Sequence, residues 1–266
     1  MNRLDSKVAI ITGGVGGIGK STIKSFINEG AKVFVTDIRD DIGHDIEKNY
    51  KNTKYFHLDV RDKQNWKDAF ESCIKTFGKV DILFNNAGVI GTFNEFGYQD
   101  PENATFESWK TIHDINLNSV FLGCKYAIKH MKENGGSIIN MSSRSGMVGV
   151  PNSAAYSSSK AAIRNFSKSV ALYCAQMGYK IRCNSIHPAA ILTDMWSHML
   201  GNSKEEQDIA ITKISSTIPL KKMGEPLDVA NLVVYLASDE SKYMTGSEII
   251  LDGGILAGSV SSPSDK

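Results

Sequence analysis

Short apolar runs without polar alternation recur along the chain, and longer segments with a helical spacing of apolar residues separate them. Such runs are typical of parallel strands that are covered on both faces. The runs that we interpret as strands are residues 8–12, 32–37, 54–60, 82–85, 137–141, 181–186 and 248–252. Helices are predicted over residues 19–29, 63–77, 107–132, 155–177 and 226–237. The alternation predicts an α/β fold, with a doubly wound parallel sheet in a single domain.

Two segments depart from this alternation, and the domain is expected to cover residues 1–258. Residues 194–217 form a long stretch rich in Met and Ser, which we interpret as a substrate-loop insertion that covers a site as a lid. Residues 259–266 are polar, and we expect them to form a flexible tail.

The charge balance excludes several classes of partner. The chain has 30 Lys and Arg against 29 Asp and Glu, scattered along its length, so neither nucleic acid nor an anionic membrane surface is expected as a partner. No apolar run approaches the length of a membrane span, and no room for a secretory signal precedes the first strand, so we expect a cytoplasmic location. The four cysteines have no zinc-like spacing, which predicts buried thiols and no metal site.

A glycine-rich turn joins the first predicted strand to the first predicted helix, and Thr12 to Gly19 read TGGVGGIG. Glycines let the backbone turn tightly and approach a pyrophosphate, and a helix N-terminus offers N–H groups to the anion. The order strand, turn, helix therefore predicts nucleotide binding in a Rossmann fold. The residues expected at the phosphates are Gly13, Gly17, Ile18 and Gly19.

The same turn formally matches a P-loop, because residues 14–21 read GVGGIGKS. A phosphotransferase needs a Mg²⁺ partner in a P-loop context, and no clear one is evident in the sequence. The motifs described next continue along the whole chain and favour a dinucleotide instead.

Carboxylates follow the second and third predicted strands. Asp37 lies 18 residues beyond the glycine turn, where a carboxylate accepts both hydroxyls of an adenosine ribose and repels the 2′-phosphate of NADP. We therefore expect NAD as the coenzyme, and Arg39 and Arg61 leave NADP as the less favoured choice. Asp59 and Val60 end the third predicted strand and are expected at the adenine, although a turn aspartate is the better explanation of Asp59 taken alone.

Tyr156 and Lys160 are four residues apart in a predicted helix, so their side chains share one face. An ammonium beside a phenol favours the phenolate, and we expect it to lower the pKa of Tyr156. Ser143 lies thirteen residues earlier, after a predicted strand, where its hydroxyl can hold a substrate oxygen. Alone, each residue has an ordinary structural explanation. Together they predict an acid/base site for a carbinol or carbonyl oxygen.

These motifs resemble the classical short-chain dehydrogenase/reductase family over nearly the whole chain. Further matches are NNAG at residues 85–88, Asn116 in the predicted helix 107–132, and the segment 187–193, which begins with His-Pro. The family usually has glycine after that proline, whereas this chain has Ala189. A positive φ at that position would cost an alanine about 1–2 kcal/mol, so the coenzyme loop is expected to lie differently.

The resemblance implies a mechanism for the four residues expected to be catalytic. Ser143 would orient the substrate oxygen, and Tyr156 would donate or accept the proton. Lys160 would lower the pKa of Tyr156 and bind the hydroxyls of the nicotinamide ribose. Asn116 would hold a water that links Lys160 to solvent.

The resemblance also implies further coenzyme contacts and an assembly. Asn86 and Gly88 would lie at the ribose region of the coenzyme, and Ile191 and Thr193 would hold the nicotinamide carboxamide. A homotetramer is implied, with one interface formed by the helices 107–132 and 155–177 and a second by the last strand.

The expected function is NAD-dependent interconversion of a secondary alcohol and a ketone, with a hydrophobic small molecule as the substrate. Residues 118–125 resemble dehydrogenases of cyclic alcohols and hydroxysteroids, which implies a cyclic or steroid-like substrate. Apolar residues after the strands and in the insertion are expected to line the substrate side: Ile90, Phe93, Phe96, Met147, Val150, Met195, Trp196 and Met199. One alternative is a 3-oxoacyl thioester reductase of lipid metabolism that prefers NADPH. Another is a catalytically silent NAD-binding sensor or scaffold, against which the intact Ser, Tyr and Lys set argues.

Overall fold

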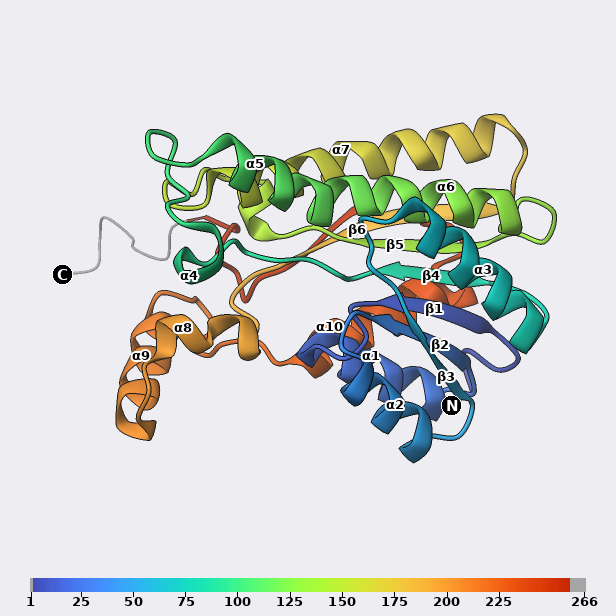
Figure 1. The fold of residues 1–266 in the computed structure, drawn as a ribbon, viewed down its shortest axis with the longest axis horizontal. Coiled ribbons are helices and arrows are strands. Elements are labelled where there is room, and N and C mark those ends of the chain that lie inside the picture. Colours follow the sequence, from blue (N-terminus) through green and yellow to red (C-terminus); the bar gives the residue numbers. More distant parts are fainter. Residues whose placement is uncertain (1, 259–266) are drawn as a thin grey trace.

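A seven-stranded sheet forms the middle layer of the computed structural model, which describes residues 2–258 (Figure 1). The strands are β1 (Val8–Thr12), β2 (Lys32–Asp37), β3 (Thr53–His57), β4 (Ile82–Asn85), β5 (Gly136–Met141), β6 (Ile181–Pro188) and β7 (Glu248–Leu251). Their spatial order is β3-β2-β1-β4-β5-β6-β7, and each of these neighbouring pairs is parallel. The order reverses between β1 and β4, where such sheets bind ligands. The predicted doubly wound α/β domain is confirmed.

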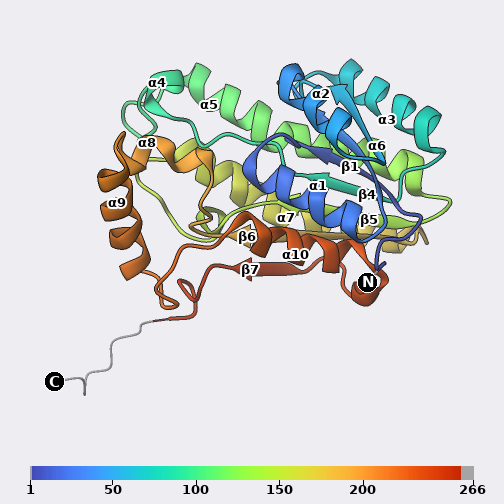
Figure 2. The same cartoon turned by 90° about the horizontal axis from the view of Figure 1, so that it is seen from below.

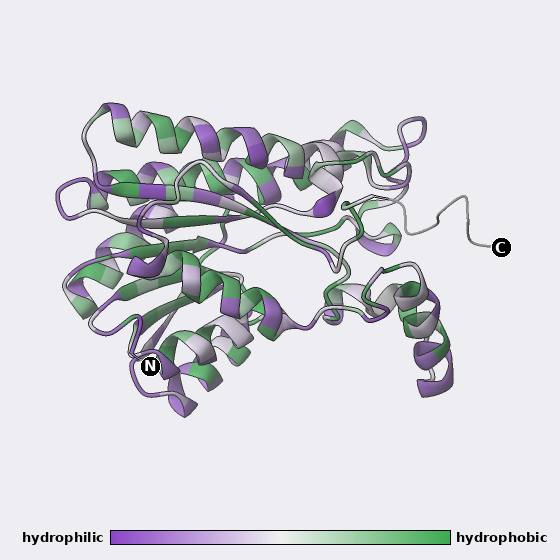
Figure 3. Cartoon of the chain, turned by 180° about the vertical axis from the view of Figure 1, so that it is seen from behind, coloured by the Kyte–Doolittle hydropathy of each residue, from purple (hydrophilic) through white to green (hydrophobic). Residues whose placement is uncertain are grey.

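Helices cover both faces of the sheet (Figures 1 and 2). One face carries α1 (Gly17–Asn28), α2 (Asp40–Asn49) and α10 (Pro226–Ala237), and the other carries α3 (Lys63–Phe77), α6 (Ser119–Met131) and α7 (Ala154–Gln176). Along β1, Val8 and Ile10 enter one apolar cluster, and Ala9 and Ile11 enter the other. Because both faces are buried, the strand is apolar from Val8 to Ile11 and ends in a buried Thr12, and Figure 3 shows hydrophobic colour along much of the sheet.

The predicted helix 107–132 is interrupted. It consists of α5 (Phe106–His113), a π-helical turn (Asp114–Asn118) and α6. The Thr105 hydroxyl begins α5 by accepting a hydrogen bond from the Ser108 N–H at 3.1 Å. The apolar spacing hides the interruption, because a π turn inserts one residue without breaking the helix.

The insertion at residues 194–217 is largely helical. A 3-10 turn (Asp194–Trp196) leads into α8 (Ser197–Leu200) and α9 (Lys204–Ser216). A capping box between Ser203 and Glu206 begins α9, which has no buried residue. It projects from the body of the molecule at the end of the sheet where α4 (Phe93–Phe96) also lies (Figures 1 and 2). Two further 3-10 turns are Arg144–Gly146 and Asp239–Ser241.

The third strand ends earlier than predicted. β3 ends at His57, so Asp59 and Val60 lie in the loop after the strand and do not end it. The helix α2 was not predicted, because its sequence is polar and contains Gly43. That glycine packs on the Tyr55 ring, where a Cβ atom would lie 2.1 Å from a ring carbon. The tail predicted at residues 259–266 lies outside the described residues. Between residues 2 and 258, no helix has both the length and the apolar character that a bilayer crossing needs.

Candidate active site

The glycine turn after β1 forms a cradle of backbone. Gly13 has a φ of 61°, and a Cβ atom on Gly19 would lie 2.3 Å from the Gly13 oxygen, so neither position tolerates a side chain easily. The helix α1 begins at Gly17 with Gly16 as its N-cap, and no side chain caps its first turn. The N–H groups there can receive an anion, and the turn therefore fits the pyrophosphate of a dinucleotide.

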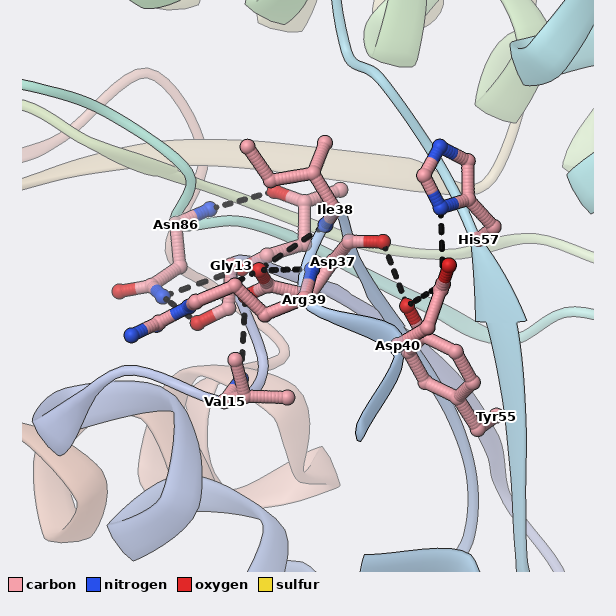
Figure 4. A network of polar contacts seen from close by, with 10 residues as sticks. Gly13, Val15, Asp37, Ile38, Arg39, Asp40, Tyr55, His57 and Asn86 are labelled. Carbon is pink, nitrogen blue, oxygen red and sulfur yellow. Dashed lines mark hydrogen bonds and ion pairs between the residues drawn. The ribbon is translucent and has the colours of Figure 1, made fainter. Parts of the chain in front are cut away.

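Asn86 ties the end of β4 to this turn (Figure 4). Its Nδ2 atom donates to the main-chain oxygens of Thr12 and Gly13, both at 3.0 Å. The Thr12 hydroxyl accepts hydrogen bonds from the main-chain N–H groups of Asn86 and Ala87. The Asn86 amide nitrogen thus shapes the cradle, and its expected contact with the coenzyme stays a prediction.

The Asp37 carboxylate is buried where β2 meets the glycine turn (Figure 4). Its Oδ2 atom accepts from the Val15 N–H at 3.2 Å, and its Oδ1 atom accepts from the Ile38 N–H at 2.9 Å. The half-exposed Arg39 side chain lies over the same carboxylate, with its Nε atom 3.4 Å from Oδ1. These contacts hold the charge of Asp37 beside the cradle.

A second group of polar side chains lies behind Asp37. The Tyr55 hydroxyl is 2.8 Å from both the Asp37 main-chain oxygen and the Asp40 carboxylate, and burial raises its pKa. His57 contacts the same Asp40 oxygen at 2.8 Å (Figure 4), and this hydrogen bond lowers the pKa of Asp40. The network fixes the end of β2 against β3.

Asp59 is already paired. Both of its carboxylate oxygens accept hydrogen bonds from the Arg61 guanidinium, which lowers the pKa of Asp59. The sequence did not predict this pairing. The Val60 main-chain oxygen accepts from the Trp66 indole N–H at 2.8 Å. The adenine contacts expected of Asp59 and Val60 stay predictions.

Lys160 is buried beneath the catalytic tyrosine candidate. Its Nζ atom donates to the Met141 main-chain oxygen at 2.9 Å and lies 5.7 Å from the centre of the Tyr156 ring. Burial lowers the pKa of Lys160 to about 8. Burial also raises the pKa of Tyr156, against a hydrogen bond with Ser143 and the positive charge of Arg144. The net pKa of Tyr156 in the chain alone is therefore raised and not lowered as expected, because desolvation dominates, whereas the role of Lys160 in stabilising the phenolate stays a prediction.

Ser143 follows β5 and faces Tyr156. It is extended, with φ −164° and ψ 159°, and its hydroxyl accepts from the Ser145 N–H at 3.1 Å. The preceding Ser142 hydroxyl donates to the Lys160 main-chain oxygen at 2.8 Å. This bond, together with that from Lys160 to Met141, ties the end of β5 to α7, and neither contact was anticipated from the sequence.

Asn116 has no exposed surface and lies in the π-helical turn. Its Oδ1 atom accepts from the Val89 N–H at 2.8 Å, and its Nδ2 atom donates to the Val89 oxygen at 2.9 Å and to the Ser159 hydroxyl at 3.2 Å. A Cβ atom on Gly88 would lie 3.0 Å from Asn116 Oδ1 and 3.3 Å from Lys160 Nζ. The structure thus brings Asn116, Gly88 and Lys160 together, whereas their roles at the coenzyme and the water stay predictions.

The segment after β6 returns to the glycine turn. A Cβ atom on Gly17 would lie 3.1 Å from the Thr193 methyl group, and Ile191 is buried and bridges to Gly224. The positive φ falls on Ala190, at 50°, and not on Ala189. The predicted position of the strain is wrong because the Ala189 N–H still donates to the Leu251 oxygen, so the chain turns one residue later.

Of the residues expected to line the substrate side, three are exposed and the other five are partly buried. Phe93 is 62% exposed, Met199 is 51% exposed, and Met195 is also exposed. Phe93 lies in α4, Met195 in the 3-10 turn before α8 and Met199 in α8, and these elements lie at the same end of the sheet (Figure 2). Their role in substrate binding stays a prediction.

Comparisons with known proteins agree with this geometry. Residues 14–256 match a family model described as enoyl-(acyl carrier protein) reductase. The NADP-dependent (R)-specific alcohol dehydrogenase of Lentilactobacillus kefiri is 40% identical over 96% of this chain and 99% of that protein. The 3-alpha-(or 20-beta)-hydroxysteroid dehydrogenase of Mycobacterium bovis is 40% identical over 96% and 92%. The solved structure of ligand-free aldohexose dehydrogenase of Thermoplasma acidophilum has a TM-score of 0.89 at 29% identity over 99% of both chains.

The chain belongs to the short-chain dehydrogenase/reductase family, which confirms the resemblance drawn from its motifs. It is therefore an oxidoreductase of a family that uses NAD(P), and its relatives act on CH–OH groups.

Proposed function

We propose that this protein is an NAD-dependent oxidoreductase that interconverts a hydrophobic secondary alcohol, cyclic or steroid-like, and its ketone. One observation carries the proposal: the Ser143 hydroxyl and the buried Lys160 flank Tyr156. The sheet edge that holds them also holds the glycine cradle. An acid/base group beside a dinucleotide cradle suits alcohol and ketone chemistry.

The chain's own residues bind the substrate oxygen and move its proton. Ser143 orients the oxygen, and Tyr156 accepts the hydroxyl proton when the alcohol is oxidised or donates it when the ketone is reduced. Lys160 supplies positive charge and a hydrogen-bond donor for the nicotinamide ribose. Asn116 holds a water that links Lys160 to solvent. The coenzyme, when bound, supplies the hydride chemistry.

The proton step needs both charges together. Burial disfavours the Tyr156 phenolate and the Lys160 ammonium separately. In a site of low dielectric the two charges attract strongly, so each stabilises the other when both are present. The pair can therefore take up the alcohol proton although neither group ionises easily alone.

The preference for NAD rests on Asp37. A buried carboxylate beside the cradle accepts ribose hydroxyls and repels a 2′-phosphate. The contact with Arg39 reduces this repulsion without removing it, since the guanidinium is half-exposed and screened. The relative from Lentilactobacillus kefiri is named as NADP-dependent, so the coenzyme ratio is part of the test.

A homotetramer and a cytoplasmic location complete the proposal. Leu172 is 69% exposed on α7, and Phe121 and Tyr173 are also exposed on the outer faces of α6 and α7. Ile250 is exposed on the edge strand β7. These apolar groups support helix and strand interfaces between copies. The four cysteines are buried and unpaired, as suits a reducing compartment.

The test is a panel of cyclic alcohols, hydroxysteroids and 3-hydroxyacyl thioesters, each measured with NAD and with NADP. Turnover of the cyclic or steroid alcohols with NAD supports the proposal. Faster turnover of acyl thioesters with the phosphorylated coenzyme supports the acyl reductase instead. Coenzyme binding without turnover of any substrate identifies a silent sensor.

A further inference from the structure

His187 is an imidazole with no exposed surface, one residue before the end of β6. Its Nδ1 atom lies 3.2 Å from the Ser143 main-chain oxygen, and its Nε2 atom lies 2.9 Å from the Ser185 hydroxyl. Both ring nitrogens thus have partners, as buried polar groups require. The mechanism described above does not use this residue.

The partner of Nδ1 determines which ring nitrogen carries the proton. A carbonyl oxygen only accepts, so Nδ1 must carry the hydrogen that is donated to Ser143. Burial lowers the pKa of His187, which favours the neutral ring with a single N–H. The lone pair on Nε2 then accepts from the Ser185 hydroxyl. The Ser143 carbonyl therefore selects the tautomer, and the Ser185 hydroxyl, which can donate or accept, adapts to it.

The hydrogen bond between His187 and Ser143 lies just beyond the point where the pairing of β5 with β6 ends. Directly after β5, the Ser142 N–H donates a hydrogen bond to the Ile186 oxygen of β6 at 2.9 Å. The carbonyl of the next residue, Ser143, accepts from the Gly146 N–H at 2.9 Å and from His187. Two donors on one carbonyl fix the peptide plane after Ser143, and that plane helps set where the hydroxyl points.

We propose that His187 is a positioning residue that aims the Ser143 hydroxyl by donating a hydrogen bond from Nδ1 to the Ser143 carbonyl. This inference rests on the proposed function, in which Ser143 orients the substrate oxygen. His187 touches neither the substrate nor the coenzyme in this scheme. Its effect reaches the reaction through Ser143 alone.

The competing explanation is a histidine that only fills space in the core, and amide variants separate the two. In H187N, the amide nitrogen lies near the position of Nδ1 and can donate to the Ser143 carbonyl. In H187Q, the amide lies near the position of Nε2 and reaches Ser185 instead. In H187L, the volume is largely kept and both bonds are lost. The comparison thus separates the loss of one hydrogen bond from the loss of side-chain volume in the core.

With the preferred alcohol and NAD, H187L is expected to lose about tenfold or more in kcat, because a small misplacement of a reacting group is costly. H187N is expected to recover kcat to within about threefold of the wild type, and H187Q to remain as slow as H187L. The Kd for NAD, measured by fluorescence, should change by less than about twofold. Wild-type kcat in H187L, or equal kcat in H187N and H187Q, would overturn the inference.

Two controls keep this result separate from the proposed function. Y156F and S143A are measured in parallel, and an active Y156F shows that the proposed function itself fails. An inactive Y156F beside a fully active H187L shows that only the role of His187 fails. If the variants do not fold, the wild type labelled with ¹⁵N-histidine gives the answer by NMR. A ring protonated at Nδ1 supports the inference, and a ring protonated at Nε2 alone overturns it, because its Nδ1 atom could not donate to the Ser143 carbonyl.

Discussion

The Nζ atom of Lys160 lies 5.7 Å from the centre of the Tyr156 ring, while its hydrogen bond goes to the main chain of Met141. The ammonium is therefore near the phenol without bonding to it in the chain alone. The separation suits a group that acts on the phenol through charge. It also leaves the donor capacity of Lys160 partly free, because an ammonium has three N–H groups.

Tyr156→Phe is expected to lower kcat by at least about 100-fold, because the ring keeps its volume and loses the group that transfers the proton. The Kd for NAD should stay close to that of the wild type, as measured by fluorescence titration. Tyr173→Phe is the matched control, since Tyr173 is exposed on the same helix and should keep full activity. Turnover of Y156F above one hundredth of normal would count against the assigned role.

Lys160→Met should change how stability depends on pH. Below about pH 8 the wild type bears the full cost of a buried ammonium, because the pKa of Lys160 is about 8 when folded and higher when unfolded. Between pH 8 and pH 10.5 the unfolded chain binds more protons than the folded chain. The free energy of unfolding of the wild type therefore rises by on the order of 3 kcal/mol relative to that of K160M over this range.

Urea unfolding of both proteins at several pH values measures this difference. Lys125→Met, at an exposed lysine on α6, is the control and should follow the wild type. A difference in the free energy of unfolding between wild type and K160M that stays constant from pH 7 to pH 10 would show that Lys160 is not buried as an ammonium.

Asp37→Ala is expected to narrow the preference for NAD over NADP by about tenfold in the ratio of kcat/KM values, because one buried negative charge is removed. Steady-state kinetics with both coenzymes measures the ratio. Asp41→Ala removes an exposed charge on α2 and should leave the ratio unchanged. An unaltered ratio in D37A would refute the ribose contact.

Ala190→Gly should stabilise the protein by about 1 kcal/mol, because Ala190 has a φ of 50° and only glycine adopts it without strain. Ala189→Gly is the matched neighbour and should destabilise by up to about 1 kcal/mol, because it only adds freedom to the unfolded chain. Denaturant unfolding compares the two. A lower stability for A190G would show that the strain lies elsewhere.

Elements with a strong apolar pattern were predictable from the sequence. The strands β1, β2 and β4 and the helices α3 and α10 have the predicted bounds, because apolar runs and caps such as Asp62 determine where they begin and end. The helices α2 and α9 were not predicted. α2 places only two large apolar residues, Ile42 and Ile46, on the core, and α9 has no buried residue, so neither has the long apolar pattern from which the other helices were predicted.

The sequence allowed us to predict which residues form the site, but not which groups form hydrogen bonds or ion pairs with each other. The order of the motifs places Ser143, Tyr156 and the glycine turn at one sheet edge, because parallel strands end together there. The partner of each polar group depends on packing between distant segments, as for Lys160 with Met141 and Asp59 with Arg61. The direction of the Tyr156 pKa was wrong because the sequence does not show how much water the fold removes.

The π-helical turn at Asp114–Asn118 also sets the phase of the helix that follows it. One residue in a helix corresponds to a rotation of about 100°. Shortening this turn by a residue would swing the apolar face of α6 away from the sheet and turn Asn116 away from Val89. The packing of α6 on the sheet and the polar contacts near Lys160 therefore both depend on the number of residues in this turn. Deletions in this stretch should damage both together.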